Sequence, residues 1–456
     1  MKKFLVLLML VALAVFALAA CAPEPTPTPV PPATAKAPEP TKAPAPTQPP
    51  AATKAPEPTK APEPTKPPLR TKANPGEIIT LYHFGDITGP YAATTAPIVL
   101  GINDAVKWLN DKGGIRGAKI AIEWADTGGK LENAISTYNR FREKKPPIMY
   151  LYGSPETEAL KDRFAEDKIP VFTAGLSAKG LYPPGYVFGD VPIYTDQFGL
   201  FLDWLTANWD KVKPAKGQAL ESPKVAILTW DGAFGLGALT AETRAYAEKK
   251  GVKIIGQELF AIGAPDVTTQ ILTAKKAGAN VIYTNTLAHG PAQILKDAVS
   301  LGVRDEFLIG GVNWAADLSM LALAGAASEG FYGVLPTLWW DDADNAGVKE
   351  VAAQFAVNSR KASDHNIAYL LAYALVDATR QIFEKTIDRV GFEGLTGAAI
   401  QETITTMGEI KAMEGITVWG FDKDKRAPVK ARIIQVQKGK FVPVSDWMVA
   451  PDLKPK

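Results

Sequence analysis

The fold is decided by the stretch Ile78-Ile79-Thr80-Leu81-Tyr82-His83-Phe84, which is followed directly by Gly85-Asp86-Ile87-Thr88-Gly89-Pro90. The first part is a short apolar run rich in β-branched and aromatic residues, which favours a buried strand. The second part is rich in turn-forming residues, which favours a loop at the end of that strand. Apolar residues then recur at helical spacing from Ile98 to Leu109, and Lys119 to Trp124 again favours a strand. The order strand, helix, strand predicts a parallel sheet with right-handed crossovers.

The same alternation starts again near residue 224. The strands expected there are Val225 to Trp230, Val252 to Leu259, Val281 to Thr284, Phe307 to Ile309 and Phe331 to Leu335. The helices expected between them are Leu239 to Lys250, Thr268 to Ala277, Pro291 to Leu301 and Leu318 to Ala324. Two such series predict an α/β fold with two doubly wound lobes. In such sheets ligands bind beyond the carboxyl ends of the strands, so the loops that follow the strands form the candidate site.

Length and composition limit the possible functions. The chain has 456 residues, which is enough for two or three domains. Lys and Arg total 50 and Asp and Glu total 48, so bulk charge gives no attraction to nucleic acid. The single cysteine, Cys21, excludes an internal disulfide and cysteine-based metal sites, and three histidines give little material for other metal sites. We therefore expect no metal and no cofactor.

Residues 1–20 have the features of an export signal. Met1-Lys2-Lys3 is positively charged, and the apolar run from Phe4 to Ala20 is short for a membrane span. The junction Leu18-Ala19-Ala20-Cys21 resembles a bacterial lipobox, in which the cysteine thiol receives a diacylglyceryl group. Two acyl chains give stable anchoring where one would be marginal. We therefore expect lipidation at Cys21, export, and anchoring at the outer face of the cytoplasmic membrane.

Residues 21–75 are dominated by Pro, Ala, Thr and Lys, with near-repeats such as Lys36–Thr41 and Lys54–Thr59. Such a composition cannot build a hydrophobic core. Proline at this density favours an extended chain of about 3.1 Å per residue. The segment is therefore predicted to be a disordered tether between the membrane and the folded body.

Two short motifs suggest catalysis but have simpler interpretations. Asp126-Thr127-Gly128 matches the signature of aspartic proteases, whose chemistry needs two such carboxylates, but it occurs once. We interpret it as a structural turn after a parallel strand. Gly235-Leu236-Gly237, with Glu258 about twenty residues on, outlines a dinucleotide-binding fingerprint, although the third glycine position holds Thr240. A dinucleotide-dependent enzyme therefore stays as an alternative.

Several stretches together resemble the type I periplasmic binding proteins of ABC importers, specifically the branched-chain amino-acid (Leu/Ile/Val) binding family. The match follows the family's order over most of residues 78–445. Its main marks are Thr88–Ala92, Gly113–Gly117, Ile169–Val171, Phe234-Gly235, Gly415–Thr417 and Phe421-Asp422.

The resemblance implies two lobes joined by a three-strand hinge and closing on a small solute, without catalysis. The crossings are expected near Thr195, Pro336 and Trp419. Lobe 1 would then comprise residues 76–196 and 337–418, and lobe 2 residues 197–336 and 419–456. The implied partners are a small solute and an importer permease, with the protein itself expected to be a monomer. A sensor module that presents its closed form to a membrane receptor is the alternative for the same fold.

The resemblance also implies ligand-binding residues. Ser154 and Ser177 would hydrogen-bond a ligand carboxylate, and Gly175 would offer a carbonyl to an ammonium. Ser154-Pro155 also favours a helix start, which attracts anions, although Ser154 could serve only as a helix cap. Selectivity would come from Tyr91 or Thr94 in lobe 1 and from Phe234, Leu287 and Trp314 in lobe 2.

One loop departs from the family pattern. Amino-acid binders carry an acid there that pairs with the ligand ammonium, whereas this chain has Val312 and Asn313. A buried ammonium without a carboxylate would be unfavourable. Either Asp231 or another acid substitutes, or the ligand has no ammonium. The expected ligand is therefore a branched-chain or other apolar amino acid, or a related amide or carboxylate, and Asn313 is included among the candidate ligand contacts.

Overall fold

A computed structural model describes residues 68–217 and 220–455. The chain divides into two units, residues 1–65 and 66–456, and the description below concerns the second. The predicted signal peptide, Cys21 and most of the predicted tether lie outside the described residues. Arg70 forms ion pairs of 2.6 Å with both Glu77 and Glu393, and the backbone of Ala73 donates to the carbonyl of Arg116. The chain is therefore already held on the folded unit before residue 76.

The first lobe contains a five-stranded sheet in which every pair of neighbours is parallel. Its order is β2-β1-β3-β4-β5. The strands are β1 (Ile78–Gly85), β2 (Lys119–Asp126), β3 (Met149–Leu151), β4 (Val171–Thr173) and β5 (Val187–Gly189). Because β1 is flanked by β2 on one side and β3 on the other, the chain changes direction across the sheet at β1. This is the switch point at which open parallel sheets form a crevice.

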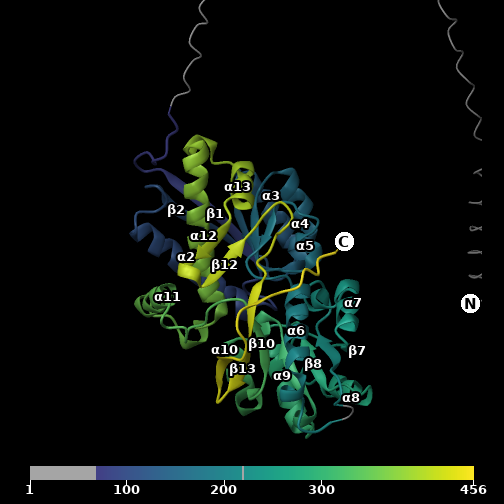
Figure 1. Cartoon of the computed structure of the whole chain (residues 1–456). Helices are drawn as coiled ribbons and strands as arrows, with labels where there is room; N and C mark the ends of the chain where they lie inside the picture. The colour runs from purple at the N-terminus through teal and green to yellow at the C-terminus, as the bar shows by residue number, and fades with distance from the viewer. Residues whose placement is uncertain (1–67, 218–219, 456) are drawn as a thin grey trace, which may run out of the picture. The chain divides into compact units, whose positions relative to one another are not determined.

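Helices cover both faces of this sheet. They are α2 (Ala92–Asp111), α3 (Leu131–Arg142), α4 (Ser154–Glu166), α5 (Ala178–Leu181), α11 (Ala346–Val357), α12 (Ile367–Val390) and α13 (Gly397–Thr406). Figure 1 shows α12 beside α2, with which it packs. Alternate residues of β1 enter different cores: Leu81 lies in the cluster with α2, and Phe84 in the one with α3 and α4. This period of two is what a sheet buried on both faces requires.

The second lobe repeats the same arrangement. Its first five strands have the order β7-β6-β8-β9-β10 and are parallel, and three further strands pair antiparallel at the β10 edge. The strands are β6 (Lys224–Thr229), β7 (Lys253–Leu259), β8 (Val281–Thr284), β9 (Leu308–Gly311), β10 (Tyr332–Leu335), β13 (Lys430–Gln437), β14 (Lys440–Pro443) and β15 (Met448–Val449). The helices are α6 (Tyr194–Val212), α7 (Ala241–Lys249), α8 (Thr268–Lys276), α9 (His289–Ser300) and α10 (Leu318–Ala324). The predicted fold of two doubly wound α/β lobes is thus confirmed.

Three segments of the described chain, residues 190–193, 336–345 and 421–429, connect the two sheets, and none contains a strand. Before the third connection, β11 (Glu409–Ala412) and β12 (Thr417–Gly420) form a small antiparallel sheet. Trp419, at the end of β12, lies 5.0 Å from the ring of Phe172 on β4, and Phe421 lies 5.3 Å from that of Phe188 on β5. Ala427 still belongs to the core of the first lobe.

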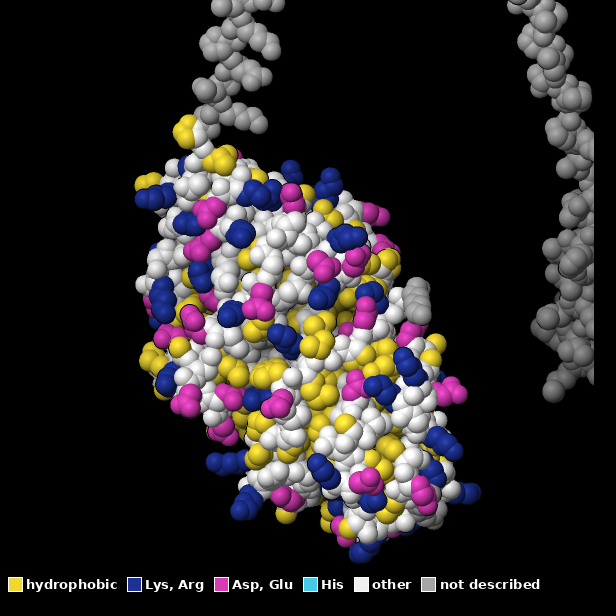
Figure 2. Space-filling view, in the orientation of Figure 1, with side chains coloured by type: hydrophobic (Ala, Val, Ile, Leu, Met, Phe, Trp, Pro, Cys, Tyr) yellow, Lys and Arg dark blue, Asp and Glu magenta, His cyan; other side chains and the backbone are white. Residues whose placement is uncertain are grey.

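Short 3-10 helices complete the described chain. They are η1 (Gly235–Ala238), η2 (Arg304–Glu306), η3 (Asn313–Ala315), η4 (Gly325–Ser328), η5 (Ala362–Asp364), η6 (Phe392–Gly394) and η7 (Met413–Gly415). On the described residues of the face in Figure 2, acidic and basic side chains are interspersed, and hydrophobic side chains gather across its middle. No described helix is both long enough and apolar enough for a bilayer crossing.

The expected elements agree with the structure except in the hinge, whose three connections contain no strand, and at the start of α2. The sequence pattern begins at Ile98, whereas the helix begins at Ala92 and contains Pro97. The first turn was missed because Ala92 to Thr95 are small or polar and show no apolar periodicity. The Thr95 hydroxyl, which donates to the backbone carbonyl of Asp86, joins this turn to the loop after β1.

Candidate ligand-binding site

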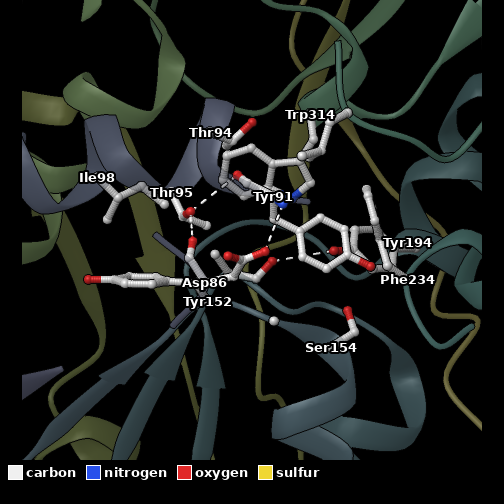
Figure 3. A pocket seen from close by; sticks show the side chains of 13 residues that line it. Asp86, Tyr91, Thr94, Thr95, Ile98, Tyr152, Ser154, Tyr194, Phe234 and Trp314 are labelled. Carbon is white, nitrogen blue, oxygen red and sulfur yellow. Dashed lines mark hydrogen bonds between the residues drawn. The ribbon is translucent and has the colours of Figure 1, made fainter. Parts of the chain in front are cut away.

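A pocket lies where the switch points of the two sheets meet. The first lobe contributes the loops after β1, β3 and β4, and the second contributes those after β6, β8 and β9. Figure 3 shows how these side chains converge. The lining residues are Asp86, Tyr91, Thr94, Thr95, Ile98, Tyr152, Gly153, Ser154, Ala174, Tyr194, Phe234, Leu287 and Trp314. The pocket therefore has the position that parallel-sheet topology predicts for a ligand.

Asp86 fixes the loop after β1. Its carboxylate accepts hydrogen bonds from the backbone amides of Gly89 and Tyr91, at 2.5 and 2.8 Å. Only 2% of Asp86 is exposed, so these two amides provide most of its solvation. The hydrogen bond to the amide of Tyr91 positions this ring over the pocket, next to the start of α2.

Ser154 is the first residue of α4, with Pro155 next in the chain. It is 2% exposed, and its hydroxyl has no hydrogen-bond partner among the described residues. The neighbouring Tyr194 hydroxyl donates instead to the carbonyl of Ala174, at 3.3 Å. In Figure 3 the Ser154 hydroxyl points toward the pocket. A buried, unpaired hydroxyl at a helix start is suited to hydrogen-bond a polar ligand group.

The second lobe contributes an apolar and mainly aromatic wall. Phe234 lies 6.1 Å from the ring of Tyr91 across the pocket and 5.2 Å from that of Tyr194. Leu287 and Trp314 line the same side. Trp230 does not line the pocket but packs behind the wall, 6.0 Å from Phe234. Such a wall favours a ligand with an apolar or planar part.

A smaller cavity adjoins the main pocket and shares Ile98, Tyr152 and Ala174 with it. Asp190, directly after β5, lines this cavity, and one of its carboxyl oxygens has no partner among the described residues. Burial raises the pKa of Asp190 to about 7. Nearby, the Tyr152 hydroxyl is paired with Nδ1 of His83 at 2.8 Å, and burial lowers the pKa of His83 to about 3. This histidine is therefore neutral at physiological pH.

The structure brings together six of the nine residues expected at the site. Tyr91, Thr94, Ser154, Phe234, Leu287 and Trp314 all line the pocket. That they bind a ligand stays a prediction.

The other three lie outside the lining. Gly175 packs against the backbone of Gly153 and Ser154. Ser177 caps α5, and its hydroxyl donates to Glu158 at 2.7 Å. Asn313 is buried and exchanges two hydrogen bonds with Gln197, of 2.9 and 3.0 Å.

Four polar residues near the pocket were not singled out from the sequence: Asp86, Glu156, Asp190 and Tyr194. Glu156 is 3% exposed and stands two positions after Ser154 on α4. Its position within Ser154-Pro155-Glu156 is typical of an acidic residue in a first helical turn, which is normally solvated. Its burial is therefore a property of the folded chain that this local pattern does not report. The signal available in the sequence was the strand-end position of Asp86 and Asp190.

The motifs considered for catalysis have structural roles. The Asp126 carboxylate accepts from the backbone of Ile87 and Gly128, both at 2.9 Å, and so ties the loop after β2 to that after β1. A Cβ atom on Gly235 would lie 2.0 Å from the carbonyl oxygen of Trp230, so this glycine allows a close backbone approach. In the described chain, no group of three or more His, Cys, Asp or Glu side chains is arranged to hold a metal ion.

A family profile described as Periplasmic binding protein matches residues 79–440, which include both sheets and the pocket. The chain belongs to the periplasmic binding protein family. Because this is a family of binding proteins, the protein binds a solute and is not an enzyme, in agreement with the sequence prediction.

The relatives are distant. Leu/Ile/Val-binding protein homolog 1 of Brucella suis biovar 1 is 28% identical over 302 residues, covering 65% of this chain and 75% of that protein. A branched-chain amino-acid ABC transporter structure from Thermus thermophilus with bound valine aligns with a TM-score of 0.72 and 23% identity, over 82% of this chain and 97% of that one. A fatty acid ABC transporter substrate-binding protein from Thermomonospora curvata aligns with a TM-score of 0.69 and 21% identity. The alignment covers 85% of this chain and 96% of that one. A structure named for branched-chain amino acids and one named for fatty acids thus share this fold.

Proposed function

We propose that the protein is an extracytoplasmic solute-binding lipoprotein of an ABC importer. Its two lobes would close on a branched-chain or other apolar amino acid, or on a related amide or carboxylate. Closure around the solute presents one defined shape to a permease. The export signal, Cys21 and the proline-rich tether would hold the binding unit outside the cytoplasm, within reach of that permease.

The observation that carries this proposal is the Ser154 hydroxyl, which is buried and unpaired at the start of α4 and faces the aromatic wall of the other lobe. A buried polar group without a partner is unfavourable in the free protein. A ligand whose polar head reaches Ser154 and whose apolar part reaches Phe234 and Trp314 would relieve that cost and bury apolar surface in both lobes. Such a ligand binds the closed arrangement better than an open one.

The test is a thermal-shift screen of the full chain in mild detergent, with Leu, Ile, Val, Phe, leucinamide and 4-methylpentanoate. A ligand at about one hundred times its Kd stabilises the folded state by about 2.7 kcal/mol, which is a measurable rise in Tm. The proposal expects a rise with at least one of these compounds. If none of them raises Tm, the proposed function loses its support.

Ser154→Ala should abolish or strongly reduce that rise while leaving Tm without ligand nearly unchanged, since its hydroxyl has no partner in the folded chain. Ser136→Ala is a matched control, because Ser136 is exposed on α3 and bonds only to the carbonyl of Asn133. An unchanged ligand response in Ser154→Ala would contradict the role given to this residue.

A further inference from the structure

The second lobe gives the pocket no acid. Its lining residues carry no charge; they are Tyr194, Phe234, Leu287 and Trp314. Asn313 is engaged with Gln197, and Val312 is buried in the core. Asp231, the substitute considered from the sequence, is exposed, and its carboxylate accepts from the amide of Gly232. A positively charged ligand group therefore has no ion-pair partner on this side.

The first lobe supplies acids instead. Asp86 lines the pocket directly, and Glu156 lies immediately behind Gly153, which also lines it. A Cβ atom on Gly153 would meet Oε2 of Glu156 at 1.8 Å, so this carboxyl occupies the place of the missing side chain. Oε2 has no hydrogen-bond partner among the described residues. The backbone amide of Tyr91 donates to the Asp86 carboxylate at 2.8 Å, and burial and the charge of Glu156, followed by that of Asp86, raise the pKa of Tyr91 to about 12.

No basic residue compensates these acids. Among the described residues that line the pocket and its adjoining cavity there is no lysine, arginine or histidine, and the cavity adds a further acid, Asp190. Burial, with a smaller contribution from Asp86, raises the pKa of Glu156. Negative charge in this pocket is therefore unfavourable until a positive group arrives.

Aromatic rings complete the surroundings. Tyr91, Tyr152, Tyr194, Phe234 and Trp314 all line the pocket. The face of an aromatic ring attracts a cation, most strongly where water is excluded. Acids on one lobe and aromatic rings on both form the setting in which proteins bind organic cations.

We infer that the ligand brings a positively charged group, such as an ammonium, which Glu156 pairs with the help of Asp86. The inference rests on the proposed solute-binding function and narrows its ligand class. Amino acids, amino amides and amines of apolar skeletons fit this pocket, whereas carboxylates without a cationic group do not. The ion pair that the loop at 312–313 cannot supply would thus be formed from the opposite lobe.

The test compares ligands that share one skeleton and differ in charge. Isothermal titration of the full chain would use 3-methylbutylamine, leucine, leucinamide and 4-methylpentanoate, and then phenethylamine, phenylalanine and 3-phenylpropanoate. Within each set, we expect the compounds with an ammonium to bind at least about tenfold more tightly than the bare carboxylate, as expected for one charged hydrogen bond. A carboxylate that binds as tightly as its matched amine would overturn the inference while leaving the proposed function intact. If no compound binds, both fail.

The role of Glu156 is tested separately. Glu156→Gln should lower affinity for the amines by about tenfold or more and reduce the difference between amine and carboxylate. Glu166→Gln removes the same charge from the exposed end of α4. It should change neither the affinity for the amines nor the difference in affinity between amine and carboxylate. If Glu156→Gln keeps the wild-type preference, this residue is not the partner. The comparison of ligands on the unmodified chain stands even if the variant fails to fold.

Discussion

At the scale of single residues, position 175 requires glycine because its neighbours leave no space for a Cβ atom. Its backbone angles do not impose this requirement. A Cβ atom there would lie 2.4 Å from the carbonyl carbon and oxygen of Gly153 and 2.5 Å from the amide of Ser154. Gly175→Ala should therefore push the start of α4 away and destabilise the protein by about 2 kcal/mol or more, as overpacking against backbone does. Urea unfolding measures the change. Gly185→Ala is the control, because nothing lies within 4 Å of its Cβ position, and it should stay within about 0.5 kcal/mol of wild type.

Asp190 should make stability depend on pH. Burial raises its pKa to about 7 in the folded chain, against about 3.9 when unfolded. Between these values the folded state binds more protons, so its stability falls as pH rises from about 4 and the loss is complete above about 7. Asp190→Asn should therefore become more stable relative to wild type between pH 5 and pH 8, by about 1–3 kcal/mol.

Urea unfolding at pH 5, 6, 7 and 8 would show this. Part of the wild-type slope should remain in the variant, because burial also raises the pKa of Asp196 to about 7. Asp162 is exposed on α4 and provides the control Asp162→Asn. The free energy of unfolding of this variant should change with pH as that of the wild type does. A difference between Asp190→Asn and wild type that stays constant with pH would contradict the assignment.

The sequence predicts the position of the pocket better than its charge. Tyr91, Ser154, Phe234 and Trp314 follow strands whose ends can be recognised from the apolar pattern, and all four line the pocket. The buried state of Glu156 could not be predicted in this way. The acid whose charge it feels, Asp86, stands about seventy residues earlier in the chain. Sequence patterns report local periodicity, whereas desolvation of an acid is a property of the packed structure.

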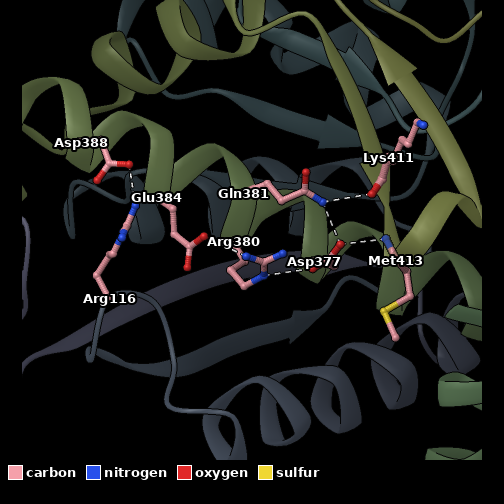
Figure 4. Close-up of polar contacts among 8 residues, drawn as sticks. All are labelled: Arg116, Asp377, Arg380, Gln381, Glu384, Asp388, Lys411 and Met413. Atoms are coloured by element: carbon pink, nitrogen blue, oxygen red, sulfur yellow. Dashed lines mark hydrogen bonds and ion pairs between the residues drawn. The ribbon is translucent and has the colours of Figure 1, made fainter. Parts of the chain in front are cut away.

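At the scale of secondary-structure elements, Asp377 joins α12 to the segment that leads into the third connection between the lobes (Figure 4). It is 5% exposed, and its carboxylate accepts from the side chains of Arg380 and Gln381 and from the backbone amide of Met413, the last at 2.8 Å. Asp377→Ala would leave the amide of Met413 without its acceptor and would remove one acceptor each from Arg380 and Gln381, which still bond to Glu384 and Lys411. We expect a loss of about 2–4 kcal/mol in urea unfolding.

Asp388 on the same helix provides the comparison for Asp377. It pairs with Arg116, and the two side chains are 52% and 39% exposed. Because solvent screens such a pair, Asp388→Ala should cost less than about 1 kcal/mol. Equal losses in Asp377→Ala and Asp388→Ala would mean that the backbone hydrogen bond to Met413 does not hold the hairpin of β11 and β12.

The sequence predicts best those elements whose apolar residues follow the strand or helix pattern along their whole length. The strands β6, β8 and β10 and the helix α8 lie within one or two residues of their expected bounds. The first turn of α2 was not predicted, because its contacts are the hydrogen bonds of Thr95 and the loop after β1 rather than a buried apolar face. Likewise, the packing of Phe421 on Phe188 depends on tertiary contacts that no local pattern reports.

At the scale of the whole molecule, the predicted anchor at Cys21 decides where the binding unit works. A diacylglyceryl group on this thiol would hold the chain at the membrane, whereas no helix of the described residues can span it. Cys21→Ser removes the acyl acceptor and should move the protein from the detergent phase to the aqueous phase in a phase-separation assay of cell extracts. Radiolabelled palmitate should enter the wild type and not the variant. Ligand affinity should stay the same, because the pocket lies entirely within residues 86–314. A Cys21→Ser chain that remains in the detergent phase would show that the apolar run from Phe4 to Ala20 is itself the anchor.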